Sequence, residues 1–383
     1  MIMLSLIKDK PFLRATAVLI GTMVGVGVFG IPFSFAKAGF WIGLSFLLGI
    51  GAVTLLLDLM YGEIVLRTHK VHQLVGYTET YLGTFWKRLI FFSVILNTYA
   101  ALLAYIIIAG DFLNNISSPL FYNSSGNLSI WFFAVVSLLI LFGIRTVSWV
   151  ELVLACLFTV VIFLIFGFGI SKIELVNYSF VNLELWILPY GILLFAFGGL
   201  SSIPIQRQLL VNNEGKFKRS IFTAMAVVAI LYFIFGFTVL GISGETTSAD
   251  AISGLIDFMG GRIIFLGSLF GILAVSTSYL MLGTAMLEIF HLDYGIPRKW
   301  AWFLVIIPPM TLFLGGLRNF IDVISLAGAV AVGLEAFVLI FVYMKAKSKG
   351  DRIPEYSMFI PAWLLYLIGA VFLGGIGYTL FTR

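Results

Sequence analysis

The sequence predicts an all-α integral membrane protein built from two five-helix repeats of opposite orientation, followed by one further helix. Three observations lead to this prediction. The 383 residues are 61% hydrophobic and only 11% charged, with a mean hydropathy of +1.10, whereas soluble domains carry about 25% charged residues. Eleven apolar segments are each long enough to cross a bilayer, which takes about 20 residues. The first and the sixth of these segments are interrupted by glycine and proline.

The predicted spans follow one another with short connections, of which 114–128 and 244–261 are the longest. Because loops of this length leave no room for a soluble domain, we expect one transmembrane domain over residues 1–383. The spans are expected at residues 12–37, 41–66, 88–113, 129–146, 149–171, 186–209, 220–243, 262–288, 300–316, 322–343 and 359–381. Residues 12–171 then form the first repeat, residues 186–343 the inverted second repeat, and residues 359–381 an accessory helix.

The lysine and arginine residues predict the orientation, because short cytoplasmic loops retain an excess of these residues. A cytoplasmic N-terminus places 18 of the 23 basic residues inside, among them Lys8 and Arg145. The opposite orientation would reverse this bias. We therefore expect a multi-pass protein of the cell membrane with a cytoplasmic N-terminus and an extracellular C-terminus.

Several function classes are excluded at this stage. The net charge of +5 follows from the membrane topology, so no nucleic-acid partner is expected. A single cysteine, Cys156, cannot form an intramolecular disulfide or a cysteine metal cluster. The run 25–30 matches G-x-G-x-x-G, but no strand precedes it, so no dinucleotide site is expected. There is no P-loop and no catalytic cluster, and we expect neither an enzyme nor a cofactor other than a coupling ion.

The first span carries the strongest signal for a functional site. It reads GTMVGVGVFGIPFSFAKAG over residues 21–39, and an interior glycine costs a helix about 1 kcal/mol and a proline about 3 kcal/mol. Non-helical backbone at membrane depth persists only where protein or a watery cavity satisfies it. The alternative is that the glycines allow close helix packing, but packing does not explain Pro32 or the matching interruption at residues 189–204.

These residues resemble a known family. The run 21–40 is similar to the opening helix of the amino acid/auxin permease group, and especially to bacterial tryptophan and tyrosine permeases in the amino acid-polyamine-organocation superfamily. Supporting runs are LMYGE at 59–63, LAYI at 103–106 with Gly110, and STSYLMLGT at 276–284. The resemblance implies a leucine-transporter-type fold and secondary active uptake of an amino acid, which would be the small-molecule partner within the lipid bilayer. No pattern indicates an oligomeric state.

The interrupted helices predict how such a substrate would be held. A helix break exposes amide groups at a positive half-helix end, which suits a carboxylate, and free carbonyl groups that suit an ammonium. On the third span, Asn97 and Tyr105 share one face, so Tyr105 could cap the substrate. The predicted substrate-binding residues are Gly25, Val26, Gly27, Val28, Phe29, Asn97, Tyr105, Phe195, Phe197, Gly198 and Gly199. With 38 phenylalanines in the chain, ordinary packing is the alternative for each phenylalanine.

The coupling ion is predicted to be sodium, again by resemblance. In the leucine-transporter architecture the spacing A-x-x-T-S on the eighth span contributes to one sodium site, and the chain has this spacing at residues 274–278. The implied ligands are the carbonyls of Gly21, Val24 and Ala274 and the hydroxyls of Thr277 and Ser278. The alternative is that these hydroxyls bond back to their own helix. A second sodium site of that architecture needs an amide where this chain has Val28, so we expect it to be absent.

A proton is the alternative coupling ion. The lysine that replaces sodium in some proton-coupled members is missing from the fifth span, which favours sodium, but intramembrane carboxylates can also relay protons. The candidates are Glu63, for which an ion pair with Arg67 is the alternative, and Glu335, which has no close partner in sequence. At the outer face, Lys37 and Asp322, with Arg318, form either a gate or a solvated rim.

The sequence therefore predicts a secondary active amino-acid symporter that works by alternating access, carries neutral or aromatic substrates and is coupled to sodium through the eighth span. Two alternatives stay open. One is proton-coupled symport, and the other is an amino-acid sensor on the same fold that binds without transporting.

Overall fold

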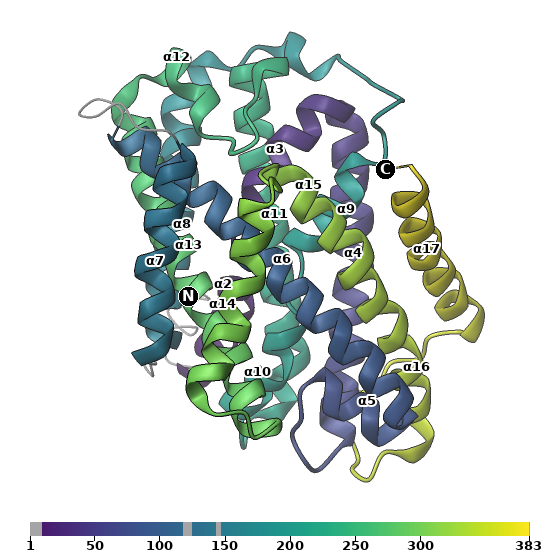
Figure 1. The fold of residues 1–383 in the computed structure, drawn as a ribbon. Helices are drawn as coiled ribbons and strands as arrows, with labels where there is room; N and C mark the ends of the chain where they lie inside the picture. Colours follow the sequence, from purple (N-terminus) through teal and green to yellow (C-terminus); the bar gives the residue numbers. More distant parts are fainter. Residues whose placement is uncertain (1–9, 118–124, 143–146, 383) are drawn as a thin grey trace.

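The computed structural model of the protein describes residues 10–117, 125–142 and 147–382. It is built from helices joined by short turns (Figure 1). The helices in chain order are α2 (Lys10–Met23), α3 (Gly27–Ala38), α4 (Phe40–Arg67), α5 (Leu74–Leu82), α6 (Thr84–Ser117), α7 (Ser125–Phe142), α8 (Val147–Gly169), α9 (Leu188–Ala196), α10 (Ile203–Leu209), α11 (Phe217–Ser243), α12 (Ile256–Met259), α13 (Gly261–Glu288), α14 (Arg298–Leu314), α15 (Phe320–Leu326), α16 (Gly333–Lys349) and α17 (Ala362–Phe381).

Each of the eleven predicted spans corresponds to a helix or to a pair of helices separated by a short break. The first span is α2 and α3, the sixth is α9 and α10, and the tenth is α15 and α16 joined by the π-helical turn Ala327–Val332. Within the described residues, seven helices are long and apolar enough to cross a membrane, and an eighth span results if the bent pair α2 and α3 counts as one.

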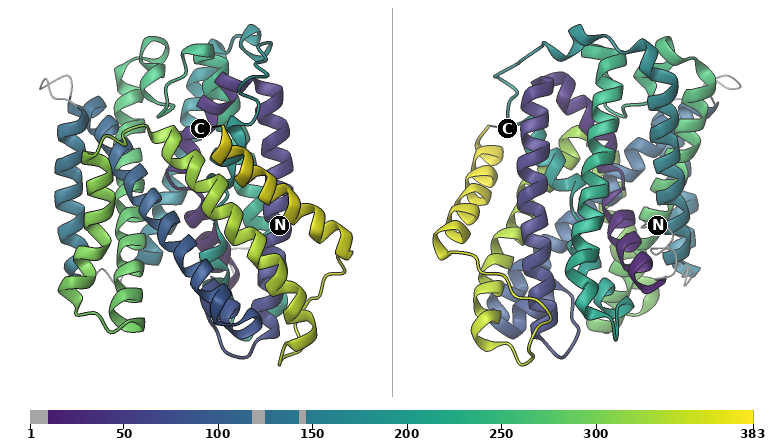
Figure 2. Two further views of the ribbon diagram at one scale, coloured as in Figure 1. Left: turned by 45° about the vertical axis from the view of Figure 1, so that its right-hand side comes forward. Right: turned by 180° about the vertical axis from the view of Figure 1, so that it is seen from behind.

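The broken helices lie in the middle of the molecule. α3 packs against α9 and α11, and α4 packs against α9, α11 and α16. On one side stand α7, α8 and α13, and on the other α17 lies at the edge against α16 (Figures 1 and 2). The centre is aromatic: the ring of Phe29 on α3 lies 4.9 Å from that of Phe112 on α6 and 6.2 Å from that of Phe235 on α11. The fold thus surrounds both breaks with protein.

The first break lies among the glycines of the first span, where the sequence predicts the broken backbone, and not at Pro32. Pro32 lies inside α3, which continues to Ala38, and the chain is instead interrupted at residues 24–26, where α2 and α3 meet at 53°. The four glycines around this point weaken the helix enough to break it, whereas a proline that has a full turn on each side can be accommodated. In the sixth span, Pro189 and Pro204 stand at the starts of α9 and α10, where proline is favoured.

The two ends of the molecule differ in charge. At the end where Figure 1 shows α5 and α10, Arg67, Arg207 and Arg352 form ion pairs with Glu63 and Glu214. This is the end that the sequence predicts to be cytoplasmic, and we call it the inner end; the orientation stays a prediction. Lys8 and Arg145, which belong to the predicted inner charge, lie outside the described residues.

Candidate functional site

The two breaks interlock, each through a glycine. A Cβ atom at Gly27, the first residue of α3, would lie 2.7 Å from the Cα atom of Ala196 at the end of α9. Reciprocally, a Cβ atom at Gly199 would meet the side chains of Met23 and Leu19 on α2. Real Cβ atoms do not come this close to backbone, so the first contact requires glycine. The breaks therefore form one structural unit.

Hydrogen bonding at the first break leaves two amides free. The amide of Gly25 donates to the carbonyl of Met23 at 2.8 Å, and the amides of Val28 and Phe29 donate to residues 25 and 26 at 3.4 and 3.2 Å. For the amides of Val26 and Gly27, no acceptor lies among the described residues. Of the five backbone positions predicted to hold a carboxylate, these two are the amides available at the start of α3.

At the second break, some carbonyls accept hydrogen bonds from the protein and others do not. The carbonyl of Phe195 accepts from the amide of Gly198 at 3.1 Å, and the carbonyl of Gly199 accepts from the amide and the hydroxyl of Ser202 at 3.0 and 2.8 Å. Within the described part of the chain, the carbonyls of Phe197 and Gly198 receive no such bond. These two are the carbonyls available to an ammonium group.

Tyr232 joins the two breaks, and the sequence analysis missed it. Its side chain is fully buried on α11, and its hydroxyl lies 2.6 Å from the carbonyl oxygen of Met23 and 2.7 Å from that of Ala196. These are the last residues of α2 and α9, whose carbonyls have no partner within the helix. A tyrosine in an apolar span gives no sequence signal of its own, because the contact depends on two residues that are 36 and 209 positions away.

Partial exposure indicates the open side of the breaks. Gly25, Phe195 and Gly198 are partly exposed, although their neighbours Val26 and Ala196 are buried. A Cβ atom at Gly25 would lie 3.6 Å from the hydroxyl of Tyr105 on α6, so the structure brings these two predicted residues together. The space beside the breaks therefore faces α6.

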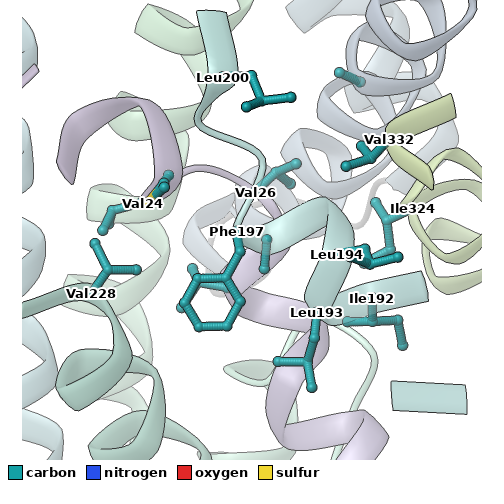
Figure 3. Close-up of a cluster of buried hydrophobic side chains, with 14 of the residues drawn as sticks. Val24, Val26, Ile192, Leu193, Leu194, Phe197, Leu200, Val228, Ile324 and Val332 are labelled. Carbon is teal, nitrogen blue, oxygen red and sulfur yellow. The ribbon is translucent and has the colours of Figure 1, made fainter. Parts of the chain in front are cut away.

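The predicted phenylalanines have different surroundings. Phe195 is partly exposed and its ring adjoins Gly27, as expected for a pocket wall. Phe29 is buried in the aromatic centre described above. Phe197 is fully buried, with its ring centre 5.0 Å from that of Tyr232 and its tip against Gly51 on α4. It belongs to the cluster of apolar side chains that also holds Val24, Val26 and Val228 (Figure 3).

Asn97 lies two turns from Tyr105 on α6, and its neighbour is a carboxyl group. The Asn97 side-chain amide interacts with Glu335 on α16. Both side chains keep one buried oxygen, Oδ1 and Oε1 respectively, without a hydrogen-bond partner in the described structure. The structure thus connects a predicted substrate residue to a predicted proton candidate.

The predicted sodium ligands lie on α2, in the break that follows it, and on α13. The hydroxyl of Thr277 donates to the carbonyl of Ala274 at 3.0 Å and to that of Leu273 at 3.3 Å, so two of the predicted ligands bond to each other. In the break that follows α2, the amides of Val24 and Gly25 donate to the carbonyls of Ile20 and Met23, and neither takes the carbonyl of Gly21. The two helices that carry the predicted ligands, α2 and α13, are connected through α8, which packs against both. The site, with Ser278, stays a prediction.

The remaining charged candidates have protein partners. Glu63 is fully buried and pairs with Arg67 at 2.8 Å, which is the alternative that the sequence offered for it. Lys37 donates to the carbonyl of Glu245 at 3.2 Å, and the amide of Asp322 donates to the side chain of Asn319 at 3.2 Å. Arg318 lies over the ring of Phe313 at 4.9 Å. Among the described residues, no group of three or more histidine, cysteine, aspartate or glutamate side chains is placed to hold a metal ion.

One surface hollow, of about 510 Å³, lies away from the breaks. It is open and is lined at the inner end by Arg67, Gly350, Asp351, Arg352, Ile353, Pro354 and Ser357. A substrate site buried between helices is not expected to have this open, charged shape. We therefore place the candidate site at the breaks.

Comparison with known proteins identifies the family. Residues 8–380 match the model of the tryptophan/tyrosine permease family. The chain belongs to this family. A relative from Haemophilus influenzae, Tyrosine-specific transport system 1, is 24% identical over 362 residues, covering 89% of this chain and 89% of the relative. The crystal structure of MhsT in complex with L-phenylalanine aligns with a TM-score of 0.66 over 96% of this chain and 98% of MhsT, at 14% identity.

The likeness to MhsT confirms the predicted fold class, the leucine-transporter-type arrangement of helices. Family membership confirms the predicted resemblance to tryptophan and tyrosine permeases, while the wider grouping with auxin permeases stays a prediction. This permease is thus a multi-pass membrane protein of a family of amino-acid transporters.

Proposed function

We propose that this permease is a secondary active symporter that carries a large neutral or aromatic amino acid by alternating access around the two helix breaks. The name of the H. influenzae relative and the phenylalanine bound to MhsT describe those proteins, and they support an aromatic substrate here. The observation that carries the proposal is the interlocked pair of breaks with unpaired amides and carbonyls on facing elements.

The two breaks offer complementary groups to the charged ends of an amino acid. The amides of Val26 and Gly27 stand at the N-terminus of α3, where the helix dipole favours a carboxylate. The carbonyls of Phe197 and Gly198 would take the ammonium. Phe195 and Tyr105 adjoin Gly27 and Gly25, and their rings would contact the substrate side chain.

For the coupling ion we propose sodium at Gly21, Val24, Ala274, Thr277 and Ser278. Five oxygens from these residues would suit a hard cation, once the hydroxyl of Thr277 turns away from its own helix. The double variant Thr277→Ala with Ser278→Ala is then expected to transport without sodium dependence. A proton is the second candidate, and the specific observation that favours it is the buried, partly unpaired carboxyl of Glu335.

The decisive experiment uses purified permease reconstituted into liposomes. Uptake of labelled tryptophan, tyrosine, phenylalanine, leucine and glycine is measured under a sodium gradient, under a proton gradient and under neither. We expect gradient-driven accumulation of the aromatic amino acids that exceeds that of glycine. Binding without accumulation under either gradient would favour a sensor, and accumulation of glycine alone would contradict the proposed pocket.

A further inference from the structure

Four polar side chains meet inside the membrane region on the side of α6 and α16. They are Tyr61 on α4, Tyr77 on α5, Asn97 on α6 and Glu335 on α16. Both tyrosines are fully buried, and Glu335 is 7% exposed. Each of the four has an oxygen atom that is buried and has no hydrogen-bond partner in the described residues. This concentration of unpaired oxygens is unusual, because buried polar groups are normally hydrogen-bonded.

The four side chains form a connected path. α16 packs against α4, α5 and α6, and the rings of Tyr61 and Tyr77 are 5.9 Å apart between centres. Glu335 contacts the side-chain amide of Asn97 and lies near enough to Tyr61 for their charges to interact. Tyr77 in turn lies next to Arg207 and the backbone of His72. The centres of the Tyr77 and His72 rings are 5.6 Å apart. Since His72 is in the connection between α4 and α5, the path runs from Glu335 to the inner end.

Water is the expected partner for these oxygens. A buried water molecule needs two to four polar partners, and the hydroxyls of Tyr61 and Tyr77 and the carboxyl of Glu335 supply them in sequence. An isolated carboxylate in apolar surroundings is strongly disfavoured, so such a group takes up a proton instead.

The charged groups near Glu335 do not compensate a negative charge on it. α4 presents Tyr61 and α5 presents Tyr77, α6 presents the neutral Asn97, and the π-helical turn Ala327–Val332 carries no ionisable residue. On α17, Tyr366 and Tyr378 are exposed. No cation interacts with Glu335 in the described structure.

The two buried carboxyls of α4, Glu63 and Asp58, fit a proton site less well. Glu63 accepts hydrogen bonds from Arg67, Ser357 and the amide of Met358, at 2.8, 3.0 and 2.8 Å, so its oxygens already have protein partners. Asp58 is fully buried and neither of its oxygens has a partner in the described structure. Its ionisable neighbour is Tyr356, whose hydroxyl already donates to the carbonyl of Leu59 at 2.7 Å, so no comparable path leads to Asp58.

We propose that Glu335 is a proton-binding site of the transport cycle, connected to the inner end by water bound along Tyr61 and Tyr77. The carboxylate takes a proton from hydronium to give the carboxylic acid and water, and the reverse step releases it at the inner end. Asn97 holds the carboxyl of Glu335 in place. Because Asn97 lies on the same face of α6 as Tyr105, it links the protonation state of Glu335 to the substrate site. The inference rests on the proposed transport function, but it does not depend on the sodium site.

The test compares proton movement with amino-acid movement in weakly buffered proteoliposomes that contain a pH-sensitive dye. Labelled tyrosine or tryptophan is supplied to the wild type and to Glu335→Gln, Asp58→Asn and Glu184→Gln, the last being an exposed glutamate as matched control. Exchange of labelled for unlabelled amino acid, which needs no net proton movement, shows that each variant is folded and binds substrate.

We expect substrate-dependent proton uptake in the wild type and in Glu184→Gln, and its loss in Glu335→Gln with exchange retained. Proton uptake that persists in Glu335→Gln, or that is lost in Asp58→Asn alone, would overturn the assignment. Amino-acid transport by the wild type without proton movement would also overturn it and leave the proposed function intact. Absence of both accumulation and exchange in the wild type would instead contradict the proposed function.

A second pair of variants tests the water path. Tyr61→Phe and Tyr77→Phe remove hydroxyls that make no hydrogen bond to the described residues. Thermal stability is therefore expected to be unchanged in Tyr61→Phe and to change little in Tyr77→Phe, whose side chain lies next to Arg207. If bound water relays the proton, both variants slow proton uptake relative to exchange. Unchanged proton rates in both would reject the path.

Discussion

The helix breaks and the inner end of α4 both hold buried polar groups, but these groups have different partners. At the breaks, the amides of Val26 and Gly27 find no acceptor in the described structure. At the inner end, Glu63 accepts hydrogen bonds from Arg67, Ser357, Tyr343 and the amide of Met358, the last three from α16 or the segment after it.

The difference separates binding from stabilisation. Groups that already have partners lose them when a ligand arrives, so they contribute little net affinity, whereas unpaired amides next to a helix N-terminus gain from a carboxylate. At the inner end, ion pairs through Glu214 join α10 to the segment 350–358. Hydrogen bonds from Arg207 and Arg352 to the carbonyls of Val65, Leu66 and Thr68 attach both to the end of α4. Substitutions at the breaks should therefore change transport, and substitutions at the inner end should change stability.

The largest effect is expected for Gly27→Val. Its Cβ atom would lie 2.7 Å from the Cα atom of Ala196, and since backbone cannot move aside cheaply, the two breaks would separate. Transport and substrate binding should be lost in the liposome assay. The matched control is Gly49→Val on α4, where a Cβ atom meets nothing within 4 Å; equal loss in the control would remove the steric explanation.

The second-largest effect is expected for Glu63→Ala, which should lower the stability of the protein. It leaves Arg67 partly buried without its partner, and breaking a buried ion pair by removing one member costs about 3–5 kcal/mol. We expect a matching decrease in the free energy of unfolding in detergent, with substrate affinity of the remaining folded protein close to that of the wild type. A stable Glu63→Ala variant that no longer binds substrate would contradict the assignment of stability to the inner end and of binding to the breaks.

Tyr232→Phe should have a mixed effect, because its hydroxyl bonds to both breaks. Loss of the hydroxyl removes one donor from the carbonyl of Met23, which still accepts from the amide of Gly25, and leaves the buried carbonyl of Ala196 without the tyrosine donor, at a cost of about 1–3 kcal/mol. Substrate affinity should fall together with stability. Tyr178→Phe serves as control, since its hydroxyl donates to the carbonyl of Phe237 at 3.0 Å, away from the breaks; it should lose stability without losing affinity.

The smallest effect is expected for Glu214→Gln. Glu214 lies 3.6 Å from Arg207 and 3.2 Å from Arg352 and is partly exposed, and such pairs contribute about 0.2–1 kcal/mol each. Thermal unfolding should shift slightly at low salt, and the shift should shrink at high salt because ions screen the pairs. A large, salt-independent shift in the unfolding temperature would show that the ion pairs of Glu214 contribute more to stability than their partial exposure indicates.

Much of the architecture could be predicted from the sequence because its signals are local. Hydropathy marks the spans, and glycine clusters mark where a helix is weak, so the breaks at residues 24–26 and 197–199 were expected within a few residues. The i,i+4 pair of Glu63 and Arg67 is local as well. Pro32 gave no information on the exact position of the break, since a proline lowers helix stability without specifying where the helix is interrupted.

The sequence by itself determined the membrane class, the spans, the two breaks and the resemblance to aromatic amino-acid permeases. Only the tertiary structure decided that Tyr232 bonds to both breaks, that Phe197 packs against α4, and that Asn97 meets Glu335. The physical reason is that these spans are apolar around their whole circumference, so hydrophobic periodicity cannot show which face of a helix turns inward. Which side chains meet then depends on how the helices pack, through contacts between residues that are distant in sequence.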